Sequence, residues 1–151
     1  MIILHKREKI ENEYSRIDND QSTIKDISNY TLVNFHFLEK HIKEIINKDL
    51  KVALELFSDE SFELIEKNLS TFSMIQINFR TFKDGRPFSF AKKLRKQLNF
   101  TNEIRAGGHI LPDQYIFLLR SGFDSVEINK EDKDIWIEIL DLDDGLYYQP
   151  D

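Results

Sequence analysis

The feature that most constrains the fold is an alternation of short apolar runs with segments whose apolar residues recur every three or four positions. The runs at 52–57 (VALELF) and 73–79 (SMIQINF) have the length and composition of single buried strands. Between them, Phe62, Ile65 and Leu69 fall on one face of a helix. The same rhythm recurs along the chain, and we expect five strands that are each followed by a helix. The expected strands lie at 30–35, 52–57, 73–79, 103–107 and 125–128.

Strands that alternate with helices of this length predict an α/β fold with a mainly parallel sheet and right-handed crossovers. About five βα units are too few for a closed barrel of eight strands, so an open doubly wound sheet and a barrel fragment both fit the length. The first 20 residues alternate weakly and predict an N-terminal β-ribbon, and the polar stretch 18–28 predicts a connector. We therefore expect a single domain over residues 1–151, with the ribbon and connector at 1–28 and the βα core at 29–151.

The absence of cysteine excludes several kinds of site. Disulfides, thiolate nucleophiles, cysteine-bound zinc or iron–sulfur clusters and dithiol redox chemistry all need that residue. Electron transfer by this chain would therefore need a bound organic cofactor or a partner. The N-terminal sequence MIILHKREKI lacks the apolar region of a signal peptide, and no apolar run approaches the roughly 18 residues that span a bilayer. We expect a cytoplasmic protein without a membrane partner.

The net charge of −6 is unevenly distributed along the chain. Residues 80–96 contain seven basic residues and one acid, a local balance of +6. Residues 130–151 contain two basic residues and eight acids, a local balance of −6. Such asymmetry can attract an anionic ligand or an acidic partner, although two solvated helix faces would give the same pattern.

Other motifs are absent from the sequence. The four histidines are scattered without the H-E-x-x-H spacing, so we expect no metal site. The cluster of basic residues at 92–96 has no accompanying aromatic platform, so we expect no nucleic-acid binding. Neither a phosphate-binding P-loop nor a dinucleotide-binding glycine motif occurs, and the identity of any cofactor stays open.

Two loops carry the polar side chains and glycines that a ligand site needs. In parallel α/β folds, ligands bind outside the carboxyl ends of the strands. A helix N-terminus there offers unpaired N–H groups, glycine allows close approach, and arginine can grip an oxyanion with two hydrogen bonds. These residue types predict an anion or cofactor-phosphate site, but they are also common in turns and first helical turns. The candidate catalytic residues are Asp84, Arg86, Arg105 and Asp113, and the candidate cofactor-binding residues are Gly85, Ser89, Gly108 and Gln114.

The same loops belong to three blocks of residues that follow one another in a fixed order. The blocks are Phe82-Lys-Asp84-Gly85-Arg86-x-Phe88-Ser89-x-Ala91-x-x-Leu94-Arg95, Glu103-Ile-Arg105-Ala106-x-Gly108-x-Ile110-Leu111-x-Asp113-Gln114 and Arg120-x-Gly122-Phe123-Asp124. Together they resemble the signature of the bacterial domain-of-unknown-function family nine-three-four. Its members are described as oxidoreductases involved in sulfite reduction, and their genes tend to lie beside those of sulfite or nitrite reductase. The chain departs from the common pattern at Lys83 and at Gly107, where an aliphatic residue is typical.

This resemblance implies two roles. The first is an oxidoreductase component of assimilatory sulfite reduction, in which Arg86 and Arg105 hold an oxyanion or a cofactor phosphate while Asp84 or Asp113 orients them or moves a proton. The second is a non-catalytic accessory protein that binds a sulfite or nitrite reductase through the opposed charge blocks. The fold also allows a third role, an enzyme that acts on an unrelated phosphorylated metabolite.

Overall fold

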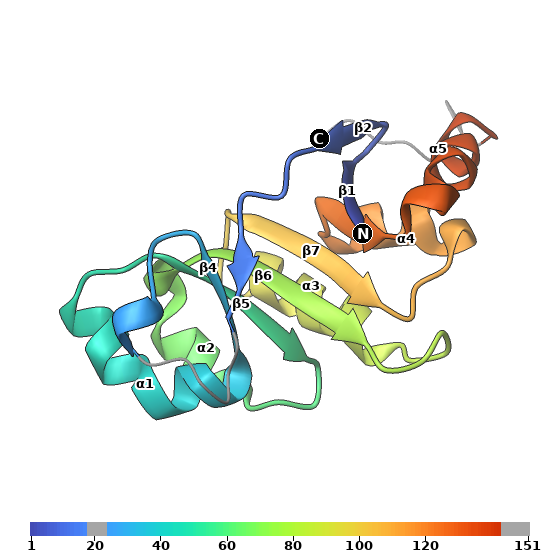
Figure 1. The fold of residues 1–151 in the computed structure, drawn as a ribbon. Helices are drawn as coiled ribbons and strands as arrows, with labels where there is room; N and C mark the ends of the chain where they lie inside the picture. The colour runs from blue at the N-terminus through green and yellow to red at the C-terminus, as the bar shows by residue number, and fades with distance from the viewer. Residues whose placement is uncertain (18–23, 143–151) are drawn as a thin grey trace.

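The computed structural model describes residues 1–17 and 24–142, which form one eight-stranded sheet flanked by helices (Figure 1). Across the sheet the strands follow the order β2-β1-β8-β7-β6-β5-β4-β3. The strands from β3 to β8 are parallel, whereas β1 is antiparallel to both β2 and β8. The strand bounds are β1 Ile2–His5, β2 Glu8–Ile10, β3 Ser15–Arg16, β4 Thr31–Asn34, β5 Val52–Phe57, β6 Phe72–Phe79, β7 Glu103–Gly108 and β8 Ser125–Ile128.

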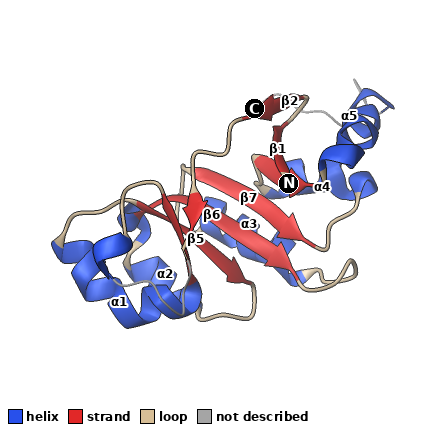
Figure 2. Cartoon of the chain, in the orientation of Figure 1, coloured by secondary structure: helices blue, strands red, loops and turns tan. Residues whose placement is uncertain are grey.

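Each of the strands β4 to β8 leads into a helix, which confirms the five predicted βα units. These five strands lie side by side in chain order, so every crossover advances in the same direction across the sheet. Right-handed crossovers of this kind place all the helices on one face, as in a barrel. The sheet is therefore a curled barrel fragment, and the doubly wound alternative is wrong. The helices are α1 Phe35–Asn47, α2 Phe62–Lys67, α3 Arg86–Lys96, α4 Tyr115–Ser121 and α5 Lys133–Leu142 (Figure 2).

Local sequence explains where several helices begin and end. The side chain of Asn34 accepts a hydrogen bond from the Phe37 N–H at 2.7 Å and so caps the first turn of α1. Pro87 stands in the first turn of α3, where its missing N–H costs nothing. The helix α4 ends at Gly122, whose φ of 112° is accessible to glycine but strained for other residues. None of the helices within 1–17 and 24–142 is long and apolar enough to cross a membrane.

The two faces of the sheet differ in polarity because successive side chains of a strand point to opposite sides. On β6, Ile75, Ile77 and Phe79 are fully buried in the core beneath the helices. The intervening residues Gln76 and Asn78 lie on the other face, which we call the concave face. The concave face carries further polar side chains on the neighbouring strands, namely Glu55, Glu103, Arg105, Ser125 and Glu127.

The N-terminal segment crosses the concave face. Since β2 and β3 occupy opposite edges of the sheet, residues 11–14 must span it, and Figure 1 shows this path in blue. Tyr14 packs against a small apolar cluster of Leu32, Ala53 and Met74, and its hydroxyl lies 3.0 Å from Ser73 Oγ. The predicted N-terminal ribbon is present as the β1–β2 hairpin. Part of the predicted connector, residues 18–23, lies outside the described residues.

Candidate functional site

A pocket of about 420 Å³ opens at the carboxyl ends of strands β5 to β8, on the concave face. This is the end of the sheet at which parallel α/β folds bind their ligands. Its lining combines carboxylates, an amide, a guanidinium, an imidazole and apolar side chains. The lining residues are Met1, Glu55, Phe57, Asn78, Phe79, Arg80, Gly108, His109 and Glu127.

We call the lining residues Glu55, Asn78 and Glu127, together with their partners Arg16 and Gln76, the floor of this pocket. At its centre, one arginine joins two glutamates. The guanidinium of Arg16, on β3, donates from Nε and Nη2 to the carboxylate of Glu55, both at 3.0 Å. It also donates from Nη1 and Nη2 to Glu127, at 3.2 and 2.9 Å. Arg16 thus makes two hydrogen bonds to each carboxylate, and this bidentate geometry fixes both carboxylates in position. Arg16, Glu55 and Glu127 together carry a formal charge of −1.

Two amides complete the floor. Gln76 Nε2 donates to Asn78 Oδ1 at 3.0 Å and to Glu127 Oε1 at 3.1 Å, and Asn78 Nδ2 donates to Glu55 Oε1 at 2.8 Å. These amides need the space beside Gly107, because a Cβ atom there would lie 2.5 Å from both Asn78 Oδ1 and Gln76 Nε2. A side chain at position 107 would therefore displace at least one of the two amides.

The electrostatics of the floor follow from this pairing. The hydrogen bonds to Glu55 outweigh the effect of burial and raise the pKa of Arg16 above its ordinary value. Burial alone would raise the pKa of Glu127. The hydrogen bond and charge of Arg16, with smaller contributions from Gln76 and Arg105, instead hold the pKa of that carboxyl below its ordinary value. Both groups are therefore charged at neutral pH.

The mouth of the pocket, which we define by Arg80 and His109, carries hydrogen-bond donors. Arg80 lies with its guanidinium carbon 4.0 Å from the centre of the Phe57 ring and donates to Asp59 at 3.1 Å. The ring of His109 lies edge-on to Phe82, with centroids 5.4 Å apart. Within the described residues, neither the His109 ring nor the Nη1 of Arg80 makes a hydrogen bond. These groups can therefore bind a ligand from the mouth.

Of the residues predicted from the sequence, the group at 84–89 lies in the loop beside Arg80 and at the start of α3. Arg86 Nε donates to Asp84 Oδ1 at 2.9 Å, and Asp84 also accepts from the Arg86 backbone N–H at 3.1 Å. The hydrogen bond from Arg86 holds the pKa of Asp84 below its ordinary value. Gly85 has no heavy atom within 4 Å of a Cβ position, and Ser89 is exposed on α3.

The second predicted group lies in the adjoining loop between β7 and α4. The loops are tied together by Gln114, which donates from Nε2 to the Phe82 carbonyl at 3.1 Å. Gly108 has a φ of 76°, and a Cβ there would lie 2.6 Å from the Phe79 carbonyl oxygen, so the position requires glycine. Asp113 is exposed in a short 3₁₀ turn, Pro112–Gln114. The structure thus brings these two loops together.

Arg105 does not join them. It points into the concave face from the third position of β7, and its side chain is only 2% exposed. It donates to Glu103 Oε2 at 2.9 Å and to Asn12 Oδ1, on the crossing N-terminal segment, at 3.2 Å. Glu103 Oε2 also accepts from Ser125 Oγ at 2.6 Å. Arg105 therefore supports the sheet beneath the pocket instead of lining its mouth.

Sequence reasoning missed the residues of the floor, Arg16, Glu55, Gln76, Asn78 and Glu127. A signal for four of them existed, because each is a polar residue within an otherwise apolar strand. Such residues alternate with the core positions and therefore share one face of the sheet. Arg16 gave no signal, since β3 is only two residues long.

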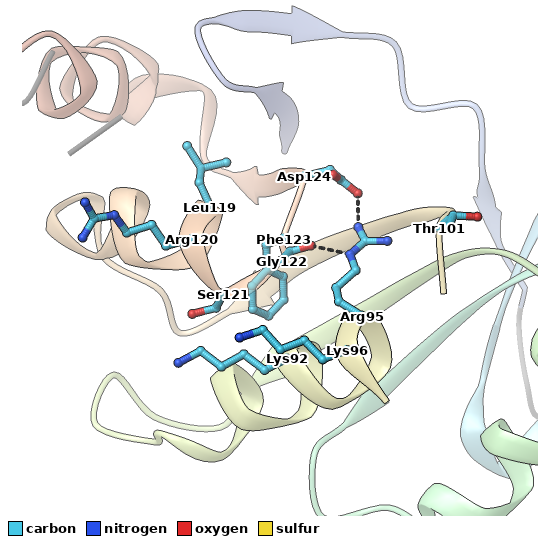
Figure 3. Close-up of a pocket in the computed structure, with 10 residues that line it drawn as sticks. All are labelled: Lys92, Arg95, Lys96, Thr101, Leu119, Arg120, Ser121, Gly122, Phe123 and Asp124. Atoms are coloured by element: carbon cyan, nitrogen blue, oxygen red, sulfur yellow. Dashed lines mark hydrogen bonds and ion pairs between the residues drawn. The ribbon is translucent and has the colours of Figure 1, made fainter. Parts of the chain in front are cut away.

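A second hollow, of about 390 Å³, lies between the C-terminal ends of α3 and α4 (Figure 3). Its wall includes Arg95, which donates to the Gly122 carbonyl at 2.9 Å and to the carboxylate of Asp124. Asp124 in turn accepts from the Ile104 backbone N–H at 3.0 Å. These contacts join the first and third blocks of the family signature and give those residues a structural role.

Neither the curated proteins nor the solved structures include a match to this chain. A family profile does match, over residues 53–150, and it spans strands β5 to β8 with the loops described above. Because the match covers more than half of the sequence, the chain belongs to the family described as "Bacterial protein of unknown function (DUF934)".

Proposed function

We propose that this protein is an oxidoreductase component of assimilatory sulfite reduction that binds an oxyanion, or the phosphate of a cofactor, at the mouth of the pocket. The observation that carries the proposal is the position of Arg80, Arg86 and His109 around the carboxyl ends of β6 and β7. Arginine side chains at this end of a parallel sheet can hold an anionic ligand with paired hydrogen bonds. The link to sulfite rests on the family resemblance.

In this proposal the predicted residues divide into two groups. Arg86 contacts the anion, Asp84 orients Arg86, and Gly85, Gly108 and Gln114 shape the two loops around it. Ser89, on α3, and Asp113, in the turn before α4, are exposed beside these loops and would also contact the bound anion or cofactor. The second group is Arg105 alone, which donates to Glu103 and holds the sheet beneath the pocket.

The proposal can be tested by titrating the ¹⁵N-labelled protein with sulfite, sulfate and phosphate and following the backbone amide signals. We expect saturable shifts at Arg80, Arg86 and His109, and we expect Arg86→Ala to weaken binding. Lys67→Ala is a matched control, since Lys67 is also an exposed cation paired with a carboxylate, Glu63, at 2.8 Å. It should bind as the wild type does. Absence of saturable shifts with all three anions would overturn the proposal.

The alternative role is a non-catalytic accessory protein that docks on a sulfite or nitrite reductase. Lys92, Lys93 and Lys96 are exposed on α3 and would meet an acidic surface of that partner. Exposed charges are screened over roughly 8 Å at physiological ionic strength, so the association should weaken as salt is raised. Association with purified reductase that is insensitive to salt would argue against this surface.

A further inference from the structure

The pocket has an asymmetry in hydrogen-bonding capacity that bears on its ligand. A carboxylate offers about four acceptor positions and a guanidinium five N–H donors. Arg16 already uses four of its N–H groups on Glu55 and Glu127, and both N–H groups of the Gln76 amide are engaged. The donors of the floor are therefore largely used.

Acceptor capacity remains at the floor. Glu55 Oε2 and Glu127 Oε2 each accept one hydrogen bond from the part of the chain that the structure describes, and both glutamates line the pocket. Gln76, which donates to Asn78 and Glu127, has a buried Oε1 that accepts no hydrogen bond from the described residues. With the formal charge of −1 on the trio of Arg16 and the two glutamates, the floor selects groups that donate hydrogen bonds.

The mouth has the opposite preference. Arg80 and His109 line the same pocket, and Arg86 lies in the adjacent loop. A volume of about 420 Å³ suits a small metabolite. One molecule can therefore contact both ends, with its donors at the glutamates and its negative charge at the arginines.

From this arrangement we infer that the ligand is a small phosphorylated or sulfonated compound whose other end carries an amine or hydroxyl groups. This inference rests on the proposed function and adds the chemical class of the ligand. Glu55 and Glu127 recognise the donor end, and the arginines at the mouth recognise the anionic end. An inorganic anion alone contacts only the mouth.

The test compares four probes on the wild-type protein by calorimetry: inorganic phosphate, glycerol, glycerol 3-phosphate and O-phosphoethanolamine. We expect at least one of the two esters to bind about tenfold or more tightly than phosphate, as hydrogen bonds to charged groups typically give. Tighter binding of glycerol 3-phosphate would indicate a ligand with hydroxyl groups, and tighter binding of O-phosphoethanolamine would indicate an amine. Equal affinity of the esters and phosphate would overturn this inference and leave the proposed function standing, whereas no binding of any anion would overturn both.

A variant locates the effect. In Glu55→Gln, the ester should bind no more tightly than inorganic phosphate, while the affinity for phosphate is retained. The reason is that Glu55 lies at the floor and not at the mouth. Glu63→Gln, which removes an exposed carboxylate from α2, should still bind the ester more tightly than phosphate. An advantage that persists in folded Glu55→Gln would contradict the role of this glutamate.

Discussion

The guanidinium of Arg16 and the carboxylate of Glu127 meet at 2.9 Å, although their strands β3 and β8 are separated in the sheet by four other strands. A flat sheet would hold these strands about 24 Å apart, since neighbouring strands are spaced by roughly 4.8 Å. Their contact therefore requires the sheet to curl. The same arginine also binds Glu55 on β5, so a single side chain connects three strands across the concave face.

The first prediction concerns the stability that this contact provides. Glu127→Gln removes the charge that Arg16 faces on β8, and we expect the free energy of unfolding to fall by about 1–3 kcal/mol. Urea denaturation measures the change. The control Glu63→Gln breaks an exposed pair with Lys67 and should leave the unfolding midpoint close to that of the wild type. Equal changes in unfolding free energy for the two substitutions would show that the Arg16–Glu127 pair stabilises the fold no more than an exposed ion pair does.

The second prediction is a pH dependence of that effect. The pKa of Glu127 is held below its ordinary value of 4.5 in the folded protein, so its ion pair stabilises the fold fully above the unfolded pKa. The contribution is lost as the pH falls through the lower, folded value. The difference in unfolding free energy between the wild type and Glu127→Gln should therefore be largest near neutral pH and shrink in acid. A difference that stays constant down to about pH 3 would contradict this assignment.

The third prediction tests the space beside the floor. Gly107→Ala would place a methyl group 2.5 Å from the amides of Gln76 and Asn78, and displacing them should destabilise the protein by about 1–3 kcal/mol. Gly85→Ala is the matched control, because nothing lies within 4 Å of its Cβ position. Its φ of −89° also suits alanine, so the unfolding free energy should be unchanged or slightly higher. Thermal unfolding of both variants distinguishes a crowded glycine from a permissive one.

The fourth prediction separates the two arginines that sequence reasoning treated alike. Arg105→Ala removes a buried guanidinium and leaves Glu103 without its cation, so we expect a loss of about 3 kcal/mol or more in unfolding free energy. Arg86→Ala removes an exposed side chain, and the backbone N–H of residue 86 still donates to Asp84, so we expect a clearly smaller fall in the unfolding midpoint. Circular dichroism during denaturation measures both. Similar midpoints for the two variants would contradict the structural role of Arg105.

The sequence by itself determined the local elements of this protein. Apolar positions two apart in 73–79 and three or four apart in the helices specify which residues face the core, because side-chain direction follows from backbone geometry alone. The five βα units, the N-terminal hairpin and the two loops at 84–89 and 108–114 all follow from such local patterns.

Only the tertiary structure decided the strand order, the curl of the sheet and the composition of the pocket. Periodicity shows that Glu55, Asn78 and Arg105 lie opposite the core, but it does not show whether that face meets solvent or encloses a cavity. The distinction depends on Arg16 reaching Glu127, 111 positions away in the chain, and on the N-terminal segment crossing the sheet. Contacts between such distant segments arise from the packing of all the strands together, and no local pattern encodes them.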